Sequence, residues 1–171
     1  MSRILGIDPG KINCGLCFIN DKEFKTWKIS IFKAESKLEK INQLVQLEIE
    51  IDNVFREFEP TIMFHEGISF GEKFGVAESG KIEYILQRTA FNHGIPFTVL
   101  SNMTIRRFLG ISKGEKTKDL ISLAIYKKFN QEFASQDQRD SFAIAKCGEA
   151  ILAGEFQLIA PKKPSKKKVV K

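Results

Sequence analysis

The stretch from Ile4 to Gly10 reads Ile-Leu-Gly-Ile-Asp-Pro-Gly, a short apolar run that ends on a single carboxylate. An apolar run of this length, followed at once by a Pro-Gly turn, is typical of a buried strand. A buried charge costs free energy unless something pairs with it. We therefore expect Asp8 to lie at the end of its strand, where a partner or a cation can reach it.

Three further acids occupy comparable positions. Glu66 closes the strand-like run 61–66, and Asp137 and Asp140 are one turn apart at the start of a predicted helix over 136–153. The same stripe of that helix continues through Ile144, Cys147 and Ile151. The two aspartates are therefore expected to extend the face of the helix that packs on the sheet.

Gathered together, these four carboxylates would repel one another and take up protons unless cations bind. Hard oxygen ligands favour Mg²⁺ or Mn²⁺, and two such ions can activate a water and stabilise the leaving oxygen in phosphodiester cleavage. Each acid also has a simpler interpretation when taken alone. Asp137 and Asp140 suit a helix start, Glu66 can pair with a lysine, and Asp8 can cap a turn.

The order of elements predicts an α/β fold with a five-stranded mixed sheet flanked by helices. Strands are expected over 3–8, 13–19, 24–32, 61–66 and 96–100, with Asn20-Asp21 as a hairpin turn. Helices are expected over 36–58, 79–93, 103–109, 115–129 and 136–153. On the first helix, Leu38, Ile41, Val45, Ile51, Phe55 and Phe58 fall roughly on one side.

The net charge of +6 comes from the C-terminal end of the chain. Removing the six lysines of residues 161–171 leaves 21 basic against 21 acidic residues, so the body is formally neutral. We expect a domain over 1–158 and a basic, disordered tail over 159–171, which either binds nucleic acid loosely or is simply solvated. Three cysteines and the lack of a long apolar stretch predict a cytoplasmic protein with no membrane partner.

The motifs LGIDPG, the acidic fourth strand and Asp-Gln-Arg-Asp-Ser-Phe-Ala-Ile-Ala from Asp137 resemble the RuvC-type Holliday junction resolvases of the RNase H-like nuclease superfamily. The similarity covers residues 1 to about 155. It implies an RNase H-like fold and Mg²⁺- or Mn²⁺-dependent nicking of paired strands in four-way DNA junctions by a homodimer. By motif position, Asp8, Glu66, Asp137 and Asp140 fall on the four catalytic, metal-binding carboxylates. Lys116 falls on a catalytic lysine.

The chain departs from the family where an aromatic residue commonly stands three positions beyond the catalytic glutamate. That position is Ser69 here, with two phenylalanines nearby, which suggests a relaxed cleavage-sequence preference. The candidate DNA contacts are Phe70, Lys73, Phe74, Arg106, Arg107, Lys113, Lys116 and Lys118. The basic residues suit phosphates and the aromatic ones suit an unpaired base. The alternatives are solvated basic helix faces and aromatic side chains that fold back into the core.

Other signals are weaker. Cys14-x-x-Cys17 has no second pair, which favours small core residues over zinc ligands. His65 precedes Glu66 in a strand and is expected on the opposite face of the sheet. The helix over 79–93 carries Ile82, Ile85, Leu86 and Phe91, more apolar surface than one surface helix needs, which suggests a dimer face.

The leading hypothesis is a metal-dependent endonuclease for branched DNA, cellular or from a bacteriophage. The alternatives are an RNA-processing nuclease of the same superfamily and a non-catalytic branched-DNA-binding module. Actin-like sugar kinases also begin with an Asp-x-Gly turn after a strand. They need a second such turn and a far longer chain, so this alternative is the weakest.

Overall fold

A single mixed sheet forms the centre of the protein. The structure is a computed structural model and describes residues 2–10, 13–21, 23–30, 33–67, 76–112 and 119–158. Its strands are β1 (Arg3–Pro9), β2 (Asn13–Asn20), β3 (Glu23–Ser30), β4 (Ile62–Glu66) and β5 (Phe97–Leu100). They lie in the order β3-β2-β1-β4-β5. The first three strands pair antiparallel, and β1, β4 and β5 run parallel. This confirms the predicted five-stranded mixed sheet.

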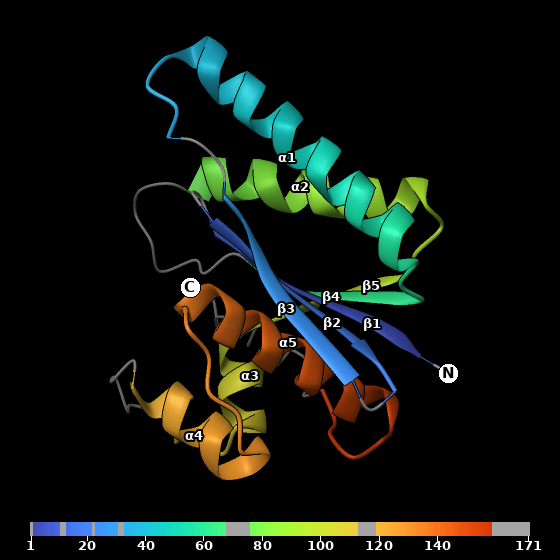
Figure 1. Cartoon of the computed structure of the whole chain (residues 1–171), viewed down its shortest axis with the longest axis vertical. Coiled ribbons are helices and arrows are strands. Elements are labelled where there is room, and N and C mark those ends of the chain that lie inside the picture. The colour runs from blue at the N-terminus through green and yellow to red at the C-terminus, as the bar shows by residue number, and fades with distance from the viewer. Residues whose placement is uncertain are drawn as a thin grey trace, which may run out of the picture.

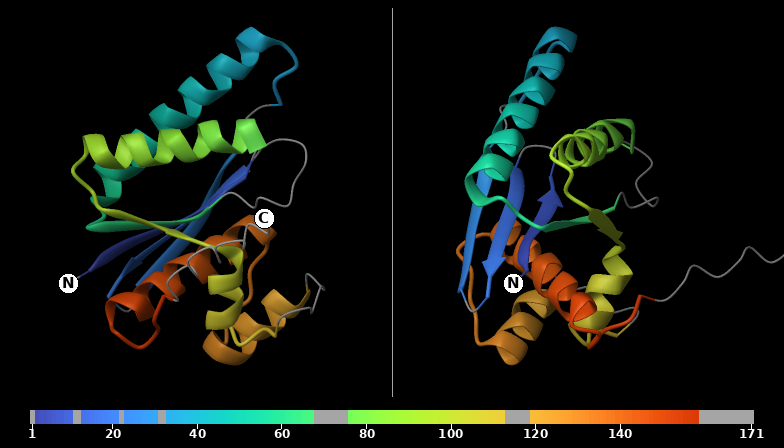
Figure 2. Two further views of the ribbon diagram at one scale, coloured as in Figure 1. Left: turned by 180° about the vertical axis from the view of Figure 1, so that it is seen from behind. Right: turned by 90° about the vertical axis from the view of Figure 1, so that its right-hand side faces the viewer.

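Helices cover both faces of the sheet. They are α1 (Lys37–Phe58), α2 (Val76–Asn92), α3 (Asn102–Phe108), α4 (Asp119–Phe129) and α5 (Gln136–Leu152). Figures 1 and 2 show α1 and α2 on one face, and α5 with α3 and α4 on the other. Within the described ranges, no helix is both long and apolar enough to cross a membrane.

Local signals in the sequence explain where several elements begin and end. Ser36 and Glu39 form a capping box at the start of α1, and Glu59 ends that helix in the left-handed conformation. Asp21 also has a positive φ, at the predicted hairpin turn. Helix α2 begins three residues earlier than predicted, at Val76. Residues 113–118, at the start of the helix predicted over 115–129, lie outside the described part, as does the tail 159–171.

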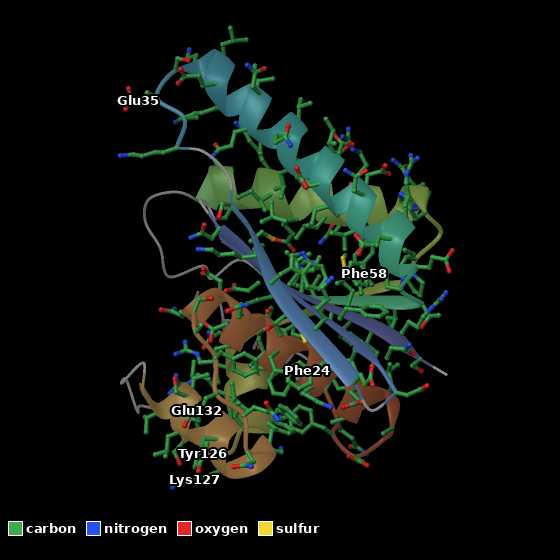
Figure 3. All side chains as sticks on the ribbon, viewed as in Figure 1. Phe24, Glu35, Phe58, Tyr126, Lys127 and Glu132 are labelled. Atoms are coloured by element: carbon green, nitrogen blue, oxygen red, sulfur yellow. The ribbon has the colours of Figure 1, made fainter. Side chains whose placement is uncertain are left out.

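The two faces of the sheet carry separate hydrophobic cores, because side chains alternate along each strand. Leu5, Ile7 and Met63 pack under α1 and α2, whereas Ile4 and Phe64 pack under α5. Figure 3 shows the same division at the edge of the sheet. There Phe58 lies on the α1 side and Phe24 on the α5 side.

The prediction that one apolar side of α1 packs in the core is only half confirmed. Ile51 and Phe55 are buried against the sheet, but Leu38, Ile41 and Val45 are 67%, 58% and 50% exposed. The reason is visible in Figure 1, where the N-terminal half of α1 extends past the sheet and so has no strand beneath it. Periodicity identified the helix correctly, but it carried no information about the length of the surface that the helix covers.

Helix α5 packs unusually close to β1 and β2. A Cβ atom added to Gly6 of β1 would lie 2.6 Å from the backbone nitrogen of Ala145 in α5. One added to Gly15 of β2 would overlap the backbone carbonyl oxygen of Asp137, and one added to Gly148 of α5 would overlap the ring of Phe64. Gly6 and Gly15 thus let the backbone of the strands meet the backbone of α5, and Gly148 leaves room for the Phe64 ring. Together these contacts fix the start of α5 over the end of β1.

We expect Gly15→Ala to lower the free energy of unfolding by about 2 kcal/mol, because the new methyl group must displace α5 or its own strand. Urea denaturation followed by circular dichroism measures this change. Lys28→Ala is the matched control, since Lys28 is the exposed β3 partner of Gly15 and its loss should change stability by less than about 0.5 kcal/mol. Equal effects of the two substitutions would show that α5 does not depend on the glycine.

Candidate active site

Asp8 and Glu66 lie at the ends of neighbouring parallel strands and belong to the same face of the sheet. The β1–β4 register pairs Ile7 with His65, so the two acids stand side by side as the next residues. Gly6 and Phe64, two positions before them, both meet α5, and alternation places Asp8 and Glu66 on that face as well. The adjoining ends of β1 and β4 therefore present two carboxylates toward α5.

Asp137 and Asp140 come from the first turns of α5. Ser135 caps the helix by accepting a hydrogen bond from the backbone N–H of Gln138 at 3.3 Å. The backbone of Asp137 packs against Gly15, and Gly15 is the β2 partner of Asp8. The close packing of α5 thus brings its two aspartates over the strand ends.

The charges of the other three acids all act on Asp8. The pKa of Asp8 is raised to about 7, first by burial and then by the charges of Asp140, Glu66 and Asp137, with Arg139 opposing. Burial also raises the pKa of Glu66, and Asp140 adds to the rise. Two buried carboxyl groups that resist ionisation in this way attract cations.

Two of the carboxylates have partners within the protein. The side-chain amide of Asn102 donates a hydrogen bond of 2.9 Å to Glu66, and Arg139 contacts Asp140 through two hydrogen bonds of 2.8 and 3.1 Å. Among the residues that the structure describes, no three His, Cys, Asp or Glu side chains converge closely enough to hold a metal ion. The donor set nevertheless fits Mg²⁺, which prefers carboxylate oxygens and keeps several waters.

Sequence reasoning missed Asn102 and the partner role of Arg139. Asn102 opens α3 directly after Ser101, which follows the end of β5, and β5 lies parallel to β4. The ends of parallel strands meet at one edge of a sheet, so this position was open to prediction. Arg139 stands between the two aspartates in the sequence, but its direction depends on the position of α4.

Most of the predicted DNA contacts cannot be placed. Phe70, Lys73, Phe74, Lys113, Lys116 and Lys118 all lie outside the described residues. Arg106 and Arg107 lie on α3, where Arg106 is half-buried and Arg107 is exposed. Arg107 donates a hydrogen bond to the carbonyl of Gln157 and stacks on Phe156 at 4.6 Å, so any phosphate must compete with these contacts.

The structure also shows the positions of His65 and of the two cysteines Cys14 and Cys17. His65 is fully buried on the face opposite Glu66, as predicted, and its Nδ1 donates to the Glu66 carbonyl oxygen at 3.1 Å. Cys14 and Cys17 are buried in different cores, on opposite faces of the sheet. Because of this separation they cannot share a zinc ion, and burial raises the pKa of both thiols.

Comparison with known proteins assigns the family. The sequence profile described as crossover junction endodeoxyribonuclease RuvC matches residues 4–148. The chain belongs to the RuvC family. RuvC enzymes are Holliday junction resolvases with an RNase H-like fold, and the family is generally Mg²⁺-dependent. The predicted family and fold are thereby confirmed. No curated protein sequence is similar enough to count as a match.

Solved structures agree on the RuvC fold. Thermus thermophilus RuvC in complex with a Holliday junction substrate has 17% sequence identity and a TM-score of 0.72, over 92% of this chain and 99% of that one. A second Thermus thermophilus RuvC structure has 18% identity and a TM-score of 0.70, over 90% and 98%. Fowlpox virus resolvase with its junction DNA has 15% identity and a TM-score of 0.55, over 84% and 95%. At these identities the likeness establishes the fold alone.

Proposed function

We propose that this RuvC-family protein resolves four-way DNA junctions, and other branched DNA, by paired metal-dependent nicks as a homodimer. The observation that carries the proposal is the cluster of four carboxylates between the ends of β1 and β4 and the start of α5. Negative charge near DNA is unfavourable unless cations use it, and this argues against a module that only binds branched DNA. The family match covers most of the proposed nuclease domain, residues 1–158.

Asp8, Glu66, Asp137 and Asp140 would hold two Mg²⁺ or Mn²⁺ ions. Bound there, the ions would lower the pKa of an attacking water and stabilise charge on the scissile phosphate. The protein's own contribution is positioning: the glycine contacts fix α5, and Asn102 fixes one oxygen of Glu66. Lys116 is proposed to stabilise the phosphate, while the other basic residues hold the DNA backbone.

Asn102→Ala is expected to slow junction cleavage about tenfold, because an unsupported metal ligand loses its orientation. A single-turnover cleavage assay measures the rate at saturating Mg²⁺. Asn92→Ala, at the end of α2 on the other face of the sheet, is the matched control and should leave the rate unchanged. If the two variants cut equally fast, the contact between Asn102 and Glu66 has no part in positioning.

The structure leaves less of α2 exposed for a dimer contact than the sequence suggested. Ile82, Ile85 and Leu86 of α2 are buried in the protein's own core. Tyr84 and Phe91, seven positions apart on the helix, are instead 61% and 79% exposed. Two exposed aromatic side chains on one helical face suit a protein interface. We propose that this face of α2 contacts a second copy of the chain.

Replacing both Tyr84 and Phe91 with serine should therefore give a monomer. Light scattering coupled to size-exclusion chromatography measures the mass. Leu152→Ser removes an exposed apolar side chain at the end of α5, and this control should remain dimeric. A double variant that keeps the wild-type mass would place the interface elsewhere.

A direct competition separates this function from the RNA-processing alternative. Labelled four-way DNA junction, linear duplex of the same sequence and a structured RNA are offered together with Mg²⁺. We expect cleavage of the junction at least tenfold faster than cleavage of either competitor. Preferential cleavage of the RNA would favour the alternative, and binding without cleavage of any substrate would favour the non-catalytic module.

A further inference from the structure

Arg139 is a buried arginine that pairs with one of the proposed metal ligands. Its Nε donates to Oδ1 of Asp140 at 2.8 Å and its Nη2 donates to Oδ2 at 3.1 Å. The two side chains are only 11% and 17% exposed. Both oxygens of Asp140 therefore accept hydrogen bonds from one guanidinium in a two-point contact, the strongest form of this interaction.

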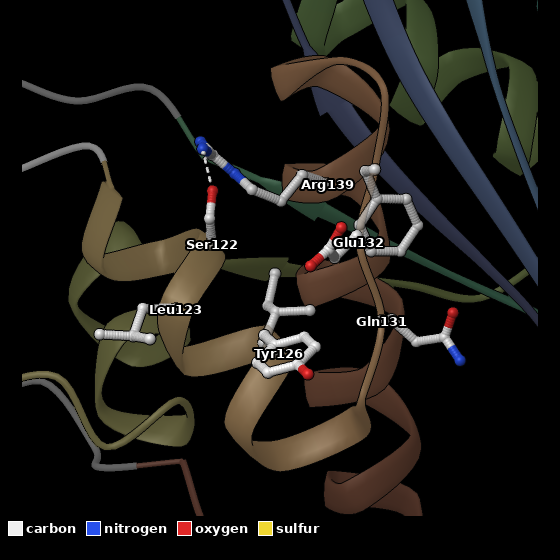
Figure 4. Close-up of a pocket in the computed structure, with 8 residues that line it drawn as sticks. Ser122, Leu123, Tyr126, Gln131, Glu132 and Arg139 are labelled. Carbon is white, nitrogen blue, oxygen red and sulfur yellow. Dashed lines mark hydrogen bonds between the residues drawn. The ribbon is translucent and has the colours of Figure 1, made fainter.

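The same guanidinium is anchored on a second helix. Its Nη1 donates to the hydroxyl oxygen of Ser122 in α4 at 3.1 Å, as Figure 4 shows. The side chain of Arg139 thus connects α4 to the proposed active site in α5. Ser122 lies outside the carboxylate cluster, so the arginine ties Asp140 to a helix that carries none of the other three acids.

A guanidinium and a divalent cation compete for the same oxygens. Arg139 holds a positive charge against Asp140, and it also lowers the pKa of Asp8, so its charge reaches the rest of the cluster. The described carboxylates do not converge on one point, and Asp140 is directed to Arg139. Both carboxylate oxygens of Asp140 therefore become available to a metal ion only when the two-point contact with Arg139 opens.

We propose that Arg139 is a positioning residue that latches Asp140 and weakens metal binding at the cluster until the latch opens. This inference rests on the proposed function, because it takes Asp140 to be a metal ligand. In the latched arrangement Arg139 compensates part of the cluster's repulsion, which stabilises the fold. Opening the latch transfers Asp140 from the arginine to the metal.

The structure leaves room for this movement. A pocket of about 420 Å³ lies between α4, residues 131–133 and α5, and Ser122, Glu132 and Arg139 are among the residues that line it. Figure 4 shows the arginine side chain running along this pocket toward α4, with the carboxylate of Glu132 also at the pocket. Arg139 can thus turn away from Asp140 and into this pocket.

Calorimetric titration of the full-length protein with MnCl2 in the absence of DNA tests the latch. We expect Arg139→Gln to tighten the Mn²⁺ dissociation constant about tenfold, because a charge-assisted contact no longer competes. Arg139→Lys keeps the charge but loses the two-point geometry, and should tighten it by about threefold. Arg56→Gln, an equal charge change on the exposed side of α1, should leave the constant unchanged.

Ser122→Ala gives a second, milder test in case Arg139→Gln does not fold. It releases only the α4 anchor, and should tighten Mn²⁺ binding about twofold. Unchanged or weaker binding in Ser122→Ala and in every Arg139 variant that folds would overturn the latch. If Asp8→Asn, with Arg139 unchanged, binds Mn²⁺ as tightly as the wild type does, the proposed metal site itself is contradicted. The two failures are therefore distinguishable.

Discussion

Asp8→Asn is expected to abolish junction cleavage, with a loss of on the order of a thousandfold or more in rate. The amide has nearly the shape of the carboxylate but lacks its charge, so the proposed metal site loses one of its four carboxylate ligands. Burial raises the pKa of Asp8, and the charges of the other three acids add to the rise, so each of these acids acts on Asp8. Single-turnover cleavage at saturating Mg²⁺ measures the loss.

Junction binding should survive in the same variant. The proposed DNA contacts come from basic residues outside the cluster, and removing a negative charge near DNA does not weaken association. Asp21→Asn is the matched control, because Asp21 lies in the exposed turn between β2 and β3, where asparagine tolerates a positive φ. Loss of both cutting and binding in Asp8→Asn would mean that Asp8 supports the fold or the DNA, and not the chemistry.

The second large effect concerns stability and pH. With metals chelated, we expect the free energy of unfolding to fall by up to about 4 kcal/mol between pH 4 and pH 8. Asp8 has a pKa of about 7 in the folded protein, against 3.8 for the ordinary side chain. Between these values the folded protein binds more protons than the unfolded chain, so stability falls as the pH rises through this window.

Asp8→Asn should remove most of this pH dependence. The variant should match the wild type near pH 4 and exceed its stability at pH 8, because its amide cannot ionise. Urea denaturation at a series of pH values in the presence of chelator measures both curves, with Asp21→Asn expected to follow the wild type. If the free energy of unfolding has the same pH dependence in the wild type and in Asp8→Asn, ionisation of Asp8 does not destabilise the fold.

The sequence predicted the sheet well because its strands carry strong local signals. The run that ends at Asp8, the hairpin turn at Asp21 and the stop at Glu59 each had a local cause, and the structure shows each element where it was expected. The start of α2 and the exposed half of α1 were not predicted correctly. These features depend on which surfaces lie beneath a helix, and that is a property of the assembled fold.

The carboxylate cluster was accessible from the sequence for a similar reason. Strand alternation fixed the faces of Asp8 and Glu66, and helical periodicity fixed the stripe of Asp137 and Asp140. The partners of these acids were harder to identify. The contact between Arg139 and Asp140 depends on where α4 supplies Ser122, and a contact between elements that are far apart in the sequence leaves no periodic pattern.

Incubation with a supercoiled plasmid that extrudes a cruciform tests the central claim most directly. Paired nicks across the four-way junction convert the circle to a linear molecule, whereas a single nick gives only a relaxed circle. With Mg²⁺ we predict linear product from the wild type and intact supercoiled plasmid from Asp8→Asn. Linear product from Asp8→Asn, or only relaxed circles from the wild type, would contradict a metal-dependent dimer that cuts both strands from this carboxylate cluster.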